Sequence, residues 1–168
     1  MWTIKKATPA EAGTVCQVIQ EVHDRMENKD LFVPCDLTYI EAHIEREGFI
    51  LAAYAPTGKM AGNFIIRYPM EHEDNLGRDA HLPPEELQKV AHMESAVVLP
   101  EYRGNHLQSK MMQYAEQVID TSRFCYLMAT ASPDNPASCK CMESNGYALI
   151  ATKEKYGGLM RRIYYKKI

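Results

Sequence analysis

The first quarter of the chain changes from an alternating pattern to a helical one. Residues 2–6 alternate as in a short strand, and Thr8, Pro9 and Glu11 then supply an N-cap, a proline at the first helical position and a capping-box glutamate. The helix that follows has one apolar stripe at helical spacing, formed by Ala12, Val15, Ile19, Val22 and Met26. We therefore predict a strand and then an amphipathic helix.

A second capping box predicts a second helix. Thr38 and Glu41 have the required spacing, Ile40 and Ile44 would face inward, and Gly48 is the expected C-terminal stop. Apolar residues at 49–55 and 60–68 then flank the turn at 56–59, which indicates a β-hairpin.

The segment 69–86 shows no periodicity. It is polar and contains three prolines, so it is either a long loop or a short helical insertion. Connections of this length in compact domains often carry function, although a solvated excursion explains the pattern equally well.

The second half predicts a strand at 89–99, a helix at 105–121 and a buried strand at 124–131. Asn135 and Pro136 begin another helix that stops at Gly146, and strands at 147–153 and 161–166 follow. Tyr156, Gly157 and Gly158 separate these last strands. The order is β-α-α-β-β-β-α-β-α-β-β, which indicates an α/β fold.

The junction at residues 96–110 is suited to holding phosphate. An apolar strand leads through Pro100 into Tyr102-Arg103-Gly104 and then a helix. The first turn of a helix presents backbone N–H groups and a partial positive charge of roughly +0.5, so an anion is stabilised there. Gly104 permits close approach and Arg103 adds a cation. A phosphate-bearing cofactor is the leading hypothesis.

Composition narrows the class of protein. A chain of 168 residues is the size of one domain, so we expect a single domain over residues 1–168. A net charge of −3 argues against a nucleic-acid binder.

No apolar run is long enough to span a membrane and the N-terminus lacks a signal peptide, so we expect a cytoplasmic protein. Five cysteines without a regular framework indicate reduced thiols, and Cys139 and Cys141 lack a second ligand pair for a metal site.

Two motifs resemble those of the GCN5-related N-acetyltransferase (GNAT) superfamily. Its acyl-CoA motif, Gln/Arg-x-x-Gly-x-Gly/Ala, begins here at Arg103, with His106 and Gln108 at the two small-residue positions. The segment from Asn135 through Ser138 to Gly146-Tyr147 resembles the second signature, at the expected distance downstream.

The resemblance implies a single-domain fold with a mixed, mostly antiparallel twisted sheet flanked by about four helices. It implies acetyl-CoA as cosubstrate, no metal, and a backbone N–H near Val97 or Val98 that stabilises the oxyanion. Twelve residues form the implied cofactor surface: Val97, Val98, Leu99, Arg103, Gly104, Asn105, His106, Leu107, Gln108, Ser109, Asn135 and Ser138. Asn135 also suits simple helix capping, which would not exclude that role.

Catalysis requires a proton acceptor, because a lysine-like amine with a pKa near about 10.4 is almost fully protonated at pH 7. In the resembling family this group lies on the central strand. Here Glu94 and His92 share one face of that strand, and we favour Glu94 over His92 as base or water-orienting group. Both also fit the ordinary role of strand residues paired with polar neighbours.

The leaving thiolate also needs a proton. The family often uses a tyrosine at the position of Met142. Tyr147 and Tyr156 are the nearby substitutes, and Tyr156 is slightly favoured because it precedes a glycine pair on a bend. A coenzyme A thiol leaves well enough that no dedicated acid is required.

These residues predict an N-acetyltransferase that uses acetyl-CoA and an amine of a small molecule or peptide. A non-catalytic acyl-CoA sensor is the alternative, favoured by Met142. A nucleotide phosphotransferase is poorly supported, since residues 104–110 lack the P-loop pattern. The acidic residues Glu71, Glu73, Asp74 and Asp79 would suit a cationic acceptor, and edge strands near the C-terminus permit a homodimer.

Overall fold

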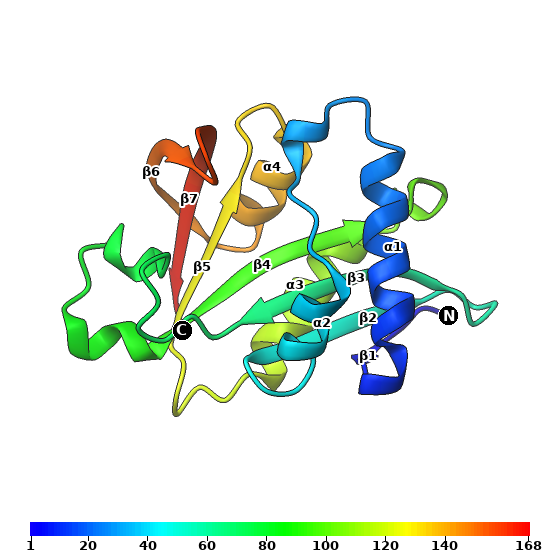
Figure 1. Ribbon diagram of the computed structural model, residues 1–168, viewed down its shortest axis with the longest axis horizontal. Helices are drawn as coiled ribbons and strands as arrows, with labels where there is room; N and C mark the ends of the chain where they lie inside the picture. Colours follow the sequence, from blue (N-terminus) through cyan, green and yellow to red (C-terminus); the bar gives the residue numbers. More distant parts are fainter. The chain divides into compact units, whose positions relative to one another are not determined.

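A computed structural model describes all residues, 1–168, in two compact units (Figure 1). The first unit contains Met1–Arg67 and Ser95–Val118, and the second contains Tyr68–Glu94 and Ile119–Ile168. Strand β4, Val90–Val98, contributes its first five residues to the second unit and its last four to the first.

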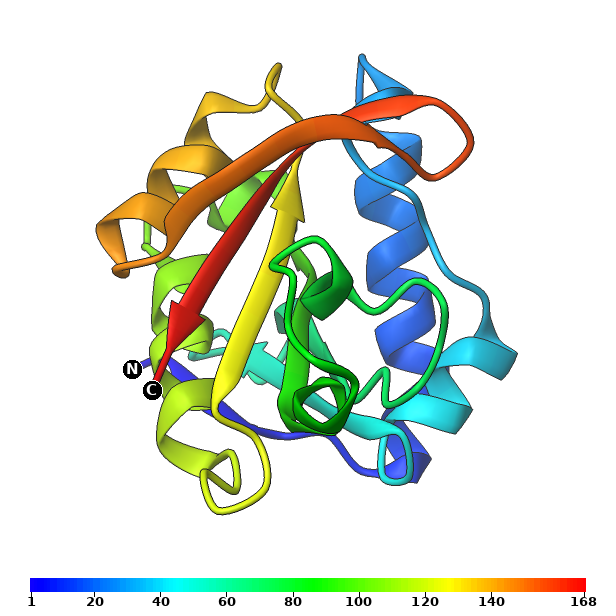
Figure 2. The ribbon, with the colours of Figure 1, turned by 90° about the vertical axis from the view of Figure 1, so that its left-hand side faces the viewer.

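The first unit packs helices on strands that pair in an antiparallel manner. Ile50 pairs with Ile65, and Thr3 pairs with Tyr54. Its elements are β1 (Thr3–Lys6), α1 (Ala12–Asp24), α2 (Leu37–His43), β2 (Gly48–Tyr54), β3 (Met60–Arg67) and α3 (Leu107–Val118). Helices α1 and α2 lie on one side of these strands and α3 on the other (Figure 2). Of the predicted stripe of α1, Ala12, Val15, Ile19 and Val22 are buried, whereas Met26 lies beyond the end of the helix and packs partly buried against the same core.

The predicted capping box of Thr8 and Glu11 is present, but it caps a short 3₁₀ turn before α1, whose own N-cap is Glu11, and the predicted capping of α2 was wrong. The Thr8 N–H donates to Glu11 Oε2 at 2.8 Å, and a short 3₁₀ turn, Pro9–Glu11, precedes α1. For α2, Asp36 is the N-cap and accepts from the Tyr39 N–H at 2.9 Å, so Thr38 lies inside the helix. An aspartate is a stronger cap than a threonine.

Gly48 is not the stop of α2. The helix ends at His43, and Gly48 is the first residue of β2. A Cβ at Gly48 would lie 1.9 Å from the Ile66 carbonyl oxygen, so close approach of β3 requires glycine there.

The second unit contains β5 (Tyr126–Ala131), α4 (Pro136–Ser144), β6 (Ala148–Lys155) and β7 (Leu159–Lys167). Strands β4 and β5 are parallel, with Val90 opposite Tyr126 and His92 opposite Met128. Strand β7 runs antiparallel to both β5 and β6. Helix α4 lies on one side of β5 and β7, and the segment that follows β3 lies on the other side (Figure 2).

For the segment predicted at 69–86, the short helical insertion is the alternative observed, and its second helix continues to Lys89. It contains two 3₁₀ helices, Leu76–Arg78 and Pro84–Lys89. Leu76 packs into a core cluster with Val90, Tyr126, Met128 and Ile163. Asn75, almost completely buried, donates to the carbonyls of Met70 and Leu87 and accepts from the Gly77 N–H, so the backbone of the insertion is well satisfied.

The strand order is β1-β2-β3-β4-β5-β7-β6, a seven-stranded mixed sheet. This order, four α-helices and the sequence of elements confirm the predicted α/β fold class. No helix is both long enough and apolar enough to cross a membrane.

Candidate active site

The turn between β4 and α3 has the shape expected of an anion-binding junction. The Leu99 N–H donates to the Ala61 carbonyl at 2.8 Å, and a 3₁₀ turn, Pro100–Tyr102, follows. Gly104 has φ +83° and His106 has φ +57°. The first intrahelical bond of α3 runs from the Lys110 N–H to the His106 carbonyl at 2.9 Å, so the amides of residues 107–109 precede it.

Side chains within the first unit hold this turn in place. Glu101 accepts from Arg25 at 2.9 Å and lies 3.6 Å from the Lys59 ammonium. Tyr102 packs edge-on against Trp2, with ring centroids 5.7 Å apart. The Asn105 side-chain amide donates to the Tyr102 carbonyl at 2.9 Å. The backbone around Arg103 is therefore preorganised by its own unit.

Burial determines which atoms of the implied cofactor-binding residues in this unit can contact a ligand. Val97, Leu99 and Leu107 are buried, so only their backbone can face a ligand. Arg103, Gly104 and His106 are exposed, and Val98, Asn105, Gln108 and Ser109 are half-buried. The apolar residues thus hold β4 and α3, while the polar ones are accessible.

His106 occupies a backbone position that favours glycine. At φ +57° a Cβ is strained, which gives a physical reason why the resembling motif has glycine there.

Asn135 acts as the N-cap of α4. Its Oδ1 accepts from the Ser138 N–H at 3.2 Å, which confirms the capping alternative. Both residues are half-buried and belong to the second unit.

A polar cluster forms in the second unit around Tyr156. The Tyr156 hydroxyl lies 2.9 Å from Thr130 Oγ1. The pairing of the parallel strands ends at His92 and Met128, and Glu94 and Thr130 each lie two residues further along their own strand. Burial raises the pKa of the Tyr156 hydroxyl; the Thr130 hydrogen bond opposes this, and the Glu94 carboxylate adds to it. Glu94, Thr130 and Tyr156 are thus brought together.

Arg161 completes this cluster. It is only 5% exposed, and its guanidinium carbon lies 5.9 Å from the centre of the Tyr156 ring. The Tyr156 hydroxyl therefore stays protonated at neutral pH, and its charged neighbours in the cluster are the Glu94 carboxylate and the Arg161 guanidinium. Sequence reasoning missed Thr130 and Arg161, since neither carries a motif and only the strand pairing places them beside Tyr156.

His92 holds the insertion rather than facing a reacting group. It is 5% exposed, and its Nε2 accepts from the Leu76 N–H at 3.0 Å. That nitrogen is engaged with the backbone, so the geometry favours Glu94 over His92 as base.

The other expected proton donor is buried. Tyr147 is 3% exposed beneath the Lys166 ammonium, and Met142 is buried as well. Tyr156, in contrast, is 51% exposed, so of positions 142, 147 and 156 it is the one whose side chain can reach solvent.

The acidic residues of the insertion do not form one cluster of free charge. Asp79 is nearly buried and pairs with Lys153 and Lys155, and the Gln88 amide donates to Glu71 at 3.2 Å. His72 lies 3.5 Å from Asp74. Because its carboxylate is already paired with two lysines, Asp79 is not available to bind the cationic acceptor expected from the sequence.

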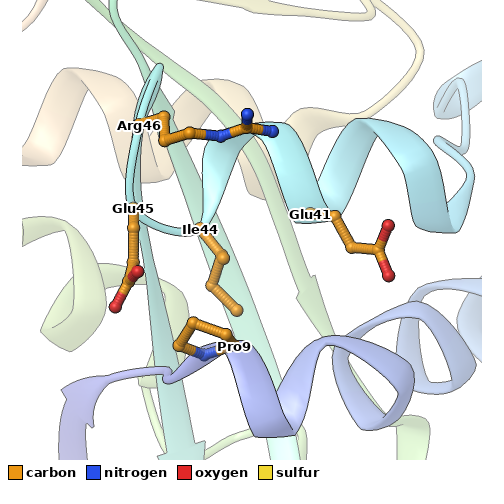
Figure 3. Close-up of a pocket in the computed structure, with 5 residues that line it drawn as sticks. All are labelled: Pro9, Glu41, Ile44, Glu45 and Arg46. Atoms are coloured by element: carbon orange, nitrogen blue, oxygen red, sulfur yellow. The ribbon is translucent and has the colours of Figure 1, made fainter.

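A separate hollow of about 270 Å³ lies in the first unit (Figure 3). It is lined by Pro9, Glu41, Ile44, Glu45 and Arg46. None of the predicted site residues lines it, so it carries no part of the candidate chemistry. The structure contains no group of three or more His, Cys, Asp or Glu residues suited to hold a metal ion.

Comparison with known proteins places these features in context. A family model described as the acetyltransferase (GNAT) family matches residues 19–147. No curated protein sequence matches the chain.

Solved structures share the fold. A GNAT-family acetyltransferase from Streptococcus pneumoniae is 15% identical, with 100% of both chains covered and a TM-score of 0.73. The ribosomal-protein-S18-alanine N-acetyltransferase from Escherichia coli is 15% identical, with coverage of 100% and 94% and a TM-score of 0.73. The putative acetyltransferase yncA from Salmonella typhimurium, solved with its cofactor acetyl-CoA, is 17% identical, with coverage of 99% and 94% and a TM-score of 0.71.

The left-handed backbone at His106 leads to a stability prediction. The free energy of unfolding of His106→Gly should exceed that of His106→Ala by about 1 kcal/mol, because only alanine retains the strained Cβ. Urea unfolding followed by circular dichroism measures the difference.

The same pair of substitutions at Lys110 is the control. Lys110 is exposed within α3, so glycine there should be less stable than alanine by about 1 kcal/mol. If glycine is also the less stable residue at position 106, the assigned backbone strain is wrong.

Proposed function

Since the chain belongs to the GNAT acetyltransferase family, we propose that it transfers the acetyl group of acetyl-CoA to an amine of a small molecule or peptide. The amine attacks the thioester directly while both substrates are bound. The observation that carries the proposal is the preorganised left-handed turn at Gly104 and His106, directly before the first turn of α3.

The turn and α3 bind the pyrophosphate. The amides of residues 107–109 and the Arg103 guanidinium supply hydrogen bonds and positive charge, and Gly104 keeps the approach open, with no heavy atom within 4 Å of a Cβ built there. The backbone of Val97 and Val98 serves the pantetheine amides and the developing oxyanion. The residues present fit this ligand.

Glu94 accepts the proton of the attacking amine, directly or through a water molecule. The amine nitrogen then forms a bond to the carbonyl carbon, and the tetrahedral intermediate collapses as the carbon–sulfur bond breaks. The products are an amide and the coenzyme A thiolate. A base of this kind typically contributes about 10²–10⁴-fold to the rate.

Tyr156 donates the proton that the thiolate needs. Burial keeps the pKa of its hydroxyl above the ordinary value, so it carries its proton at neutral pH. Thr130 orients this hydroxyl, and solvent returns the proton because half of the Tyr156 side chain is exposed.

A sensor that binds acyl-CoA without turnover is the second candidate. Met142 favours it, since the family often has a tyrosine at this position and the buried methionine cannot donate a proton.

Two measurements separate these functions. Thiol release from acetyl-CoA is recorded against a panel of amines, with mass spectrometry of the product, and calorimetry measures acetyl-CoA binding. Release with an acetylated product supports the transferase, whereas binding without release selects the sensor. Absence of binding at millimolar coenzyme A contradicts both.

The role of Glu94 predicts a change in kcat. Glu94→Gln should lower kcat by about 10²-fold and leave acetyl-CoA affinity within twofold of wild type, because the lost group acts on the amine. The acidic limb of the pH–rate profile should disappear. A profile that keeps this limb would remove Glu94 from the mechanism.

The role of Arg103 predicts a change in affinity. Arg103→Ala should weaken acetyl-CoA binding by about 10-fold, while binding of acetyl-pantetheine, which lacks the diphosphate, stays unchanged. Calorimetry with both ligands measures the difference. Equal losses for the two ligands would contradict phosphate recognition by Arg103.

A further inference from the structure

A nearly buried carboxylate links the insertion to the β6–β7 hairpin. The Asp79 side chain is 6% exposed, the Lys155 ammonium lies 2.7 Å from its Oδ2, and Lys153 pairs with its Oδ1. Burial raises the pKa of Asp79, but hydrogen bonds and charges from the two lysines outweigh it, so the pKa lies below its ordinary value. Asp79 is therefore ionised at neutral pH and holds both lysines.

Asp79 is itself fixed to β4. Its N–H donates to the Leu76 carbonyl at 3.0 Å, and the Leu76 N–H donates to His92 Nε2 at 3.0 Å. His92 lies on β4, two residues before Glu94. The carboxylate is thus attached to the strand that carries the proposed base.

Lys155 is the residue directly before Tyr156. The hairpin turns through three consecutive residues with positive φ: Tyr156 at +50°, Gly157 at +79° and Gly158 at +105°. The Gly158 N–H closes the turn on the Lys155 carbonyl at 3.2 Å. A non-glycine residue in this conformation is strained and persists only where neighbouring contacts hold it.

Two contacts therefore constrain Tyr156 from opposite ends. Thr130 holds the hydroxyl, and the Asp79–Lys155 pair holds the backbone residue before it. Strand β6 is the edge of the sheet and its side chains are mostly exposed, so its own packing contributes little restraint. A reacting group must be held to within about 0.5 Å of its productive position.

We infer that Asp79 is a positioning residue that acts through Lys155 to hold the Tyr156 hydroxyl beside Thr130 and Glu94. The inference rests on the proposed function, in which Tyr156 protonates the leaving thiolate. It assigns the insertion a structural role in the site: it braces the hairpin, and Asp79 does not bind the acceptor.

The test combines kinetics with ¹⁹F NMR of the protein labelled with 3-fluorotyrosine, in which Tyr156→Phe identifies the Tyr156 resonance. Asp79→Asn should shift or broaden that resonance and lower kcat by about 10-fold, with KM for acetyl-CoA within about twofold. Asp79→Glu should recover most of kcat. Lys155→Gln should reproduce the effects of Asp79→Asn, and it provides the test if Asp79→Asn does not fold.

Two comparisons decide whether the effect is specific. Glu85→Gln removes an exposed carboxylate of the same insertion and should leave kcat and the resonance unchanged. The double variant Asp79→Asn/Lys155→Gln should be no slower than Asp79→Asn alone, because Asp79→Asn already breaks the Asp79–Lys155 pair. An unchanged Tyr156 resonance in Asp79→Asn, or additive losses in the double variant, would overturn the inference.

The NMR result does not depend on turnover. If wild-type protein releases no thiol with any amine, the proposed function fails, while the Tyr156 resonance in Asp79→Asn still reports whether Asp79 positions this side chain.

Discussion

The pairing of β4 is the constraint on which the candidate chemistry depends. Its first residues pair in parallel with β5 as far as His92, two residues before Glu94. Beyond its end, the Leu99 N–H donates to the Ala61 carbonyl before the chain enters the turn at Gly104. Because side chains alternate along a strand, a shift of one residue in this pairing would turn Glu94 to the other face. The register of one strand therefore determines where the proposed base points.

Polar contacts in the second unit are concentrated where function is proposed. His92, Asn75 and Arg161 are all buried, and His92 and Asn75 accept or donate hydrogen bonds that fix the insertion. Buried polar groups cost free energy unless they are paired, so each of them specifies a single arrangement of its neighbours. An apolar insertion could cover β5 equally well, but it would not define the position of the hairpin.

Two departures from the family motifs have different physical consequences. His106 adopts the backbone conformation that the motif reserves for glycine, so this chain tolerates strain at the junction. Met142 is a buried apolar side chain, so α4 has no hydroxyl at the position where the family often has a tyrosine. Tyr156, on a different hairpin, has a hydroxyl whose pKa is raised by burial.

The sequence alone determined most of the elements and the glycine turn before α3, because both depend on local physics. Helical stripes, the Thr8 cap, the Asn135 cap and the glycine turn before α3 are set by residues a few positions apart. Local signals misled where a stronger cap stood nearby, as at Asp36, and where a glycine was needed for strand packing and not for a helix end, as at Gly48. Tertiary structure alone decided the contacts of Thr130 with Tyr156, His92 with Leu76 and Asp79 with Lys155. These pairs lie far apart in the chain, and only strand pairing and packing bring them within hydrogen-bonding distance.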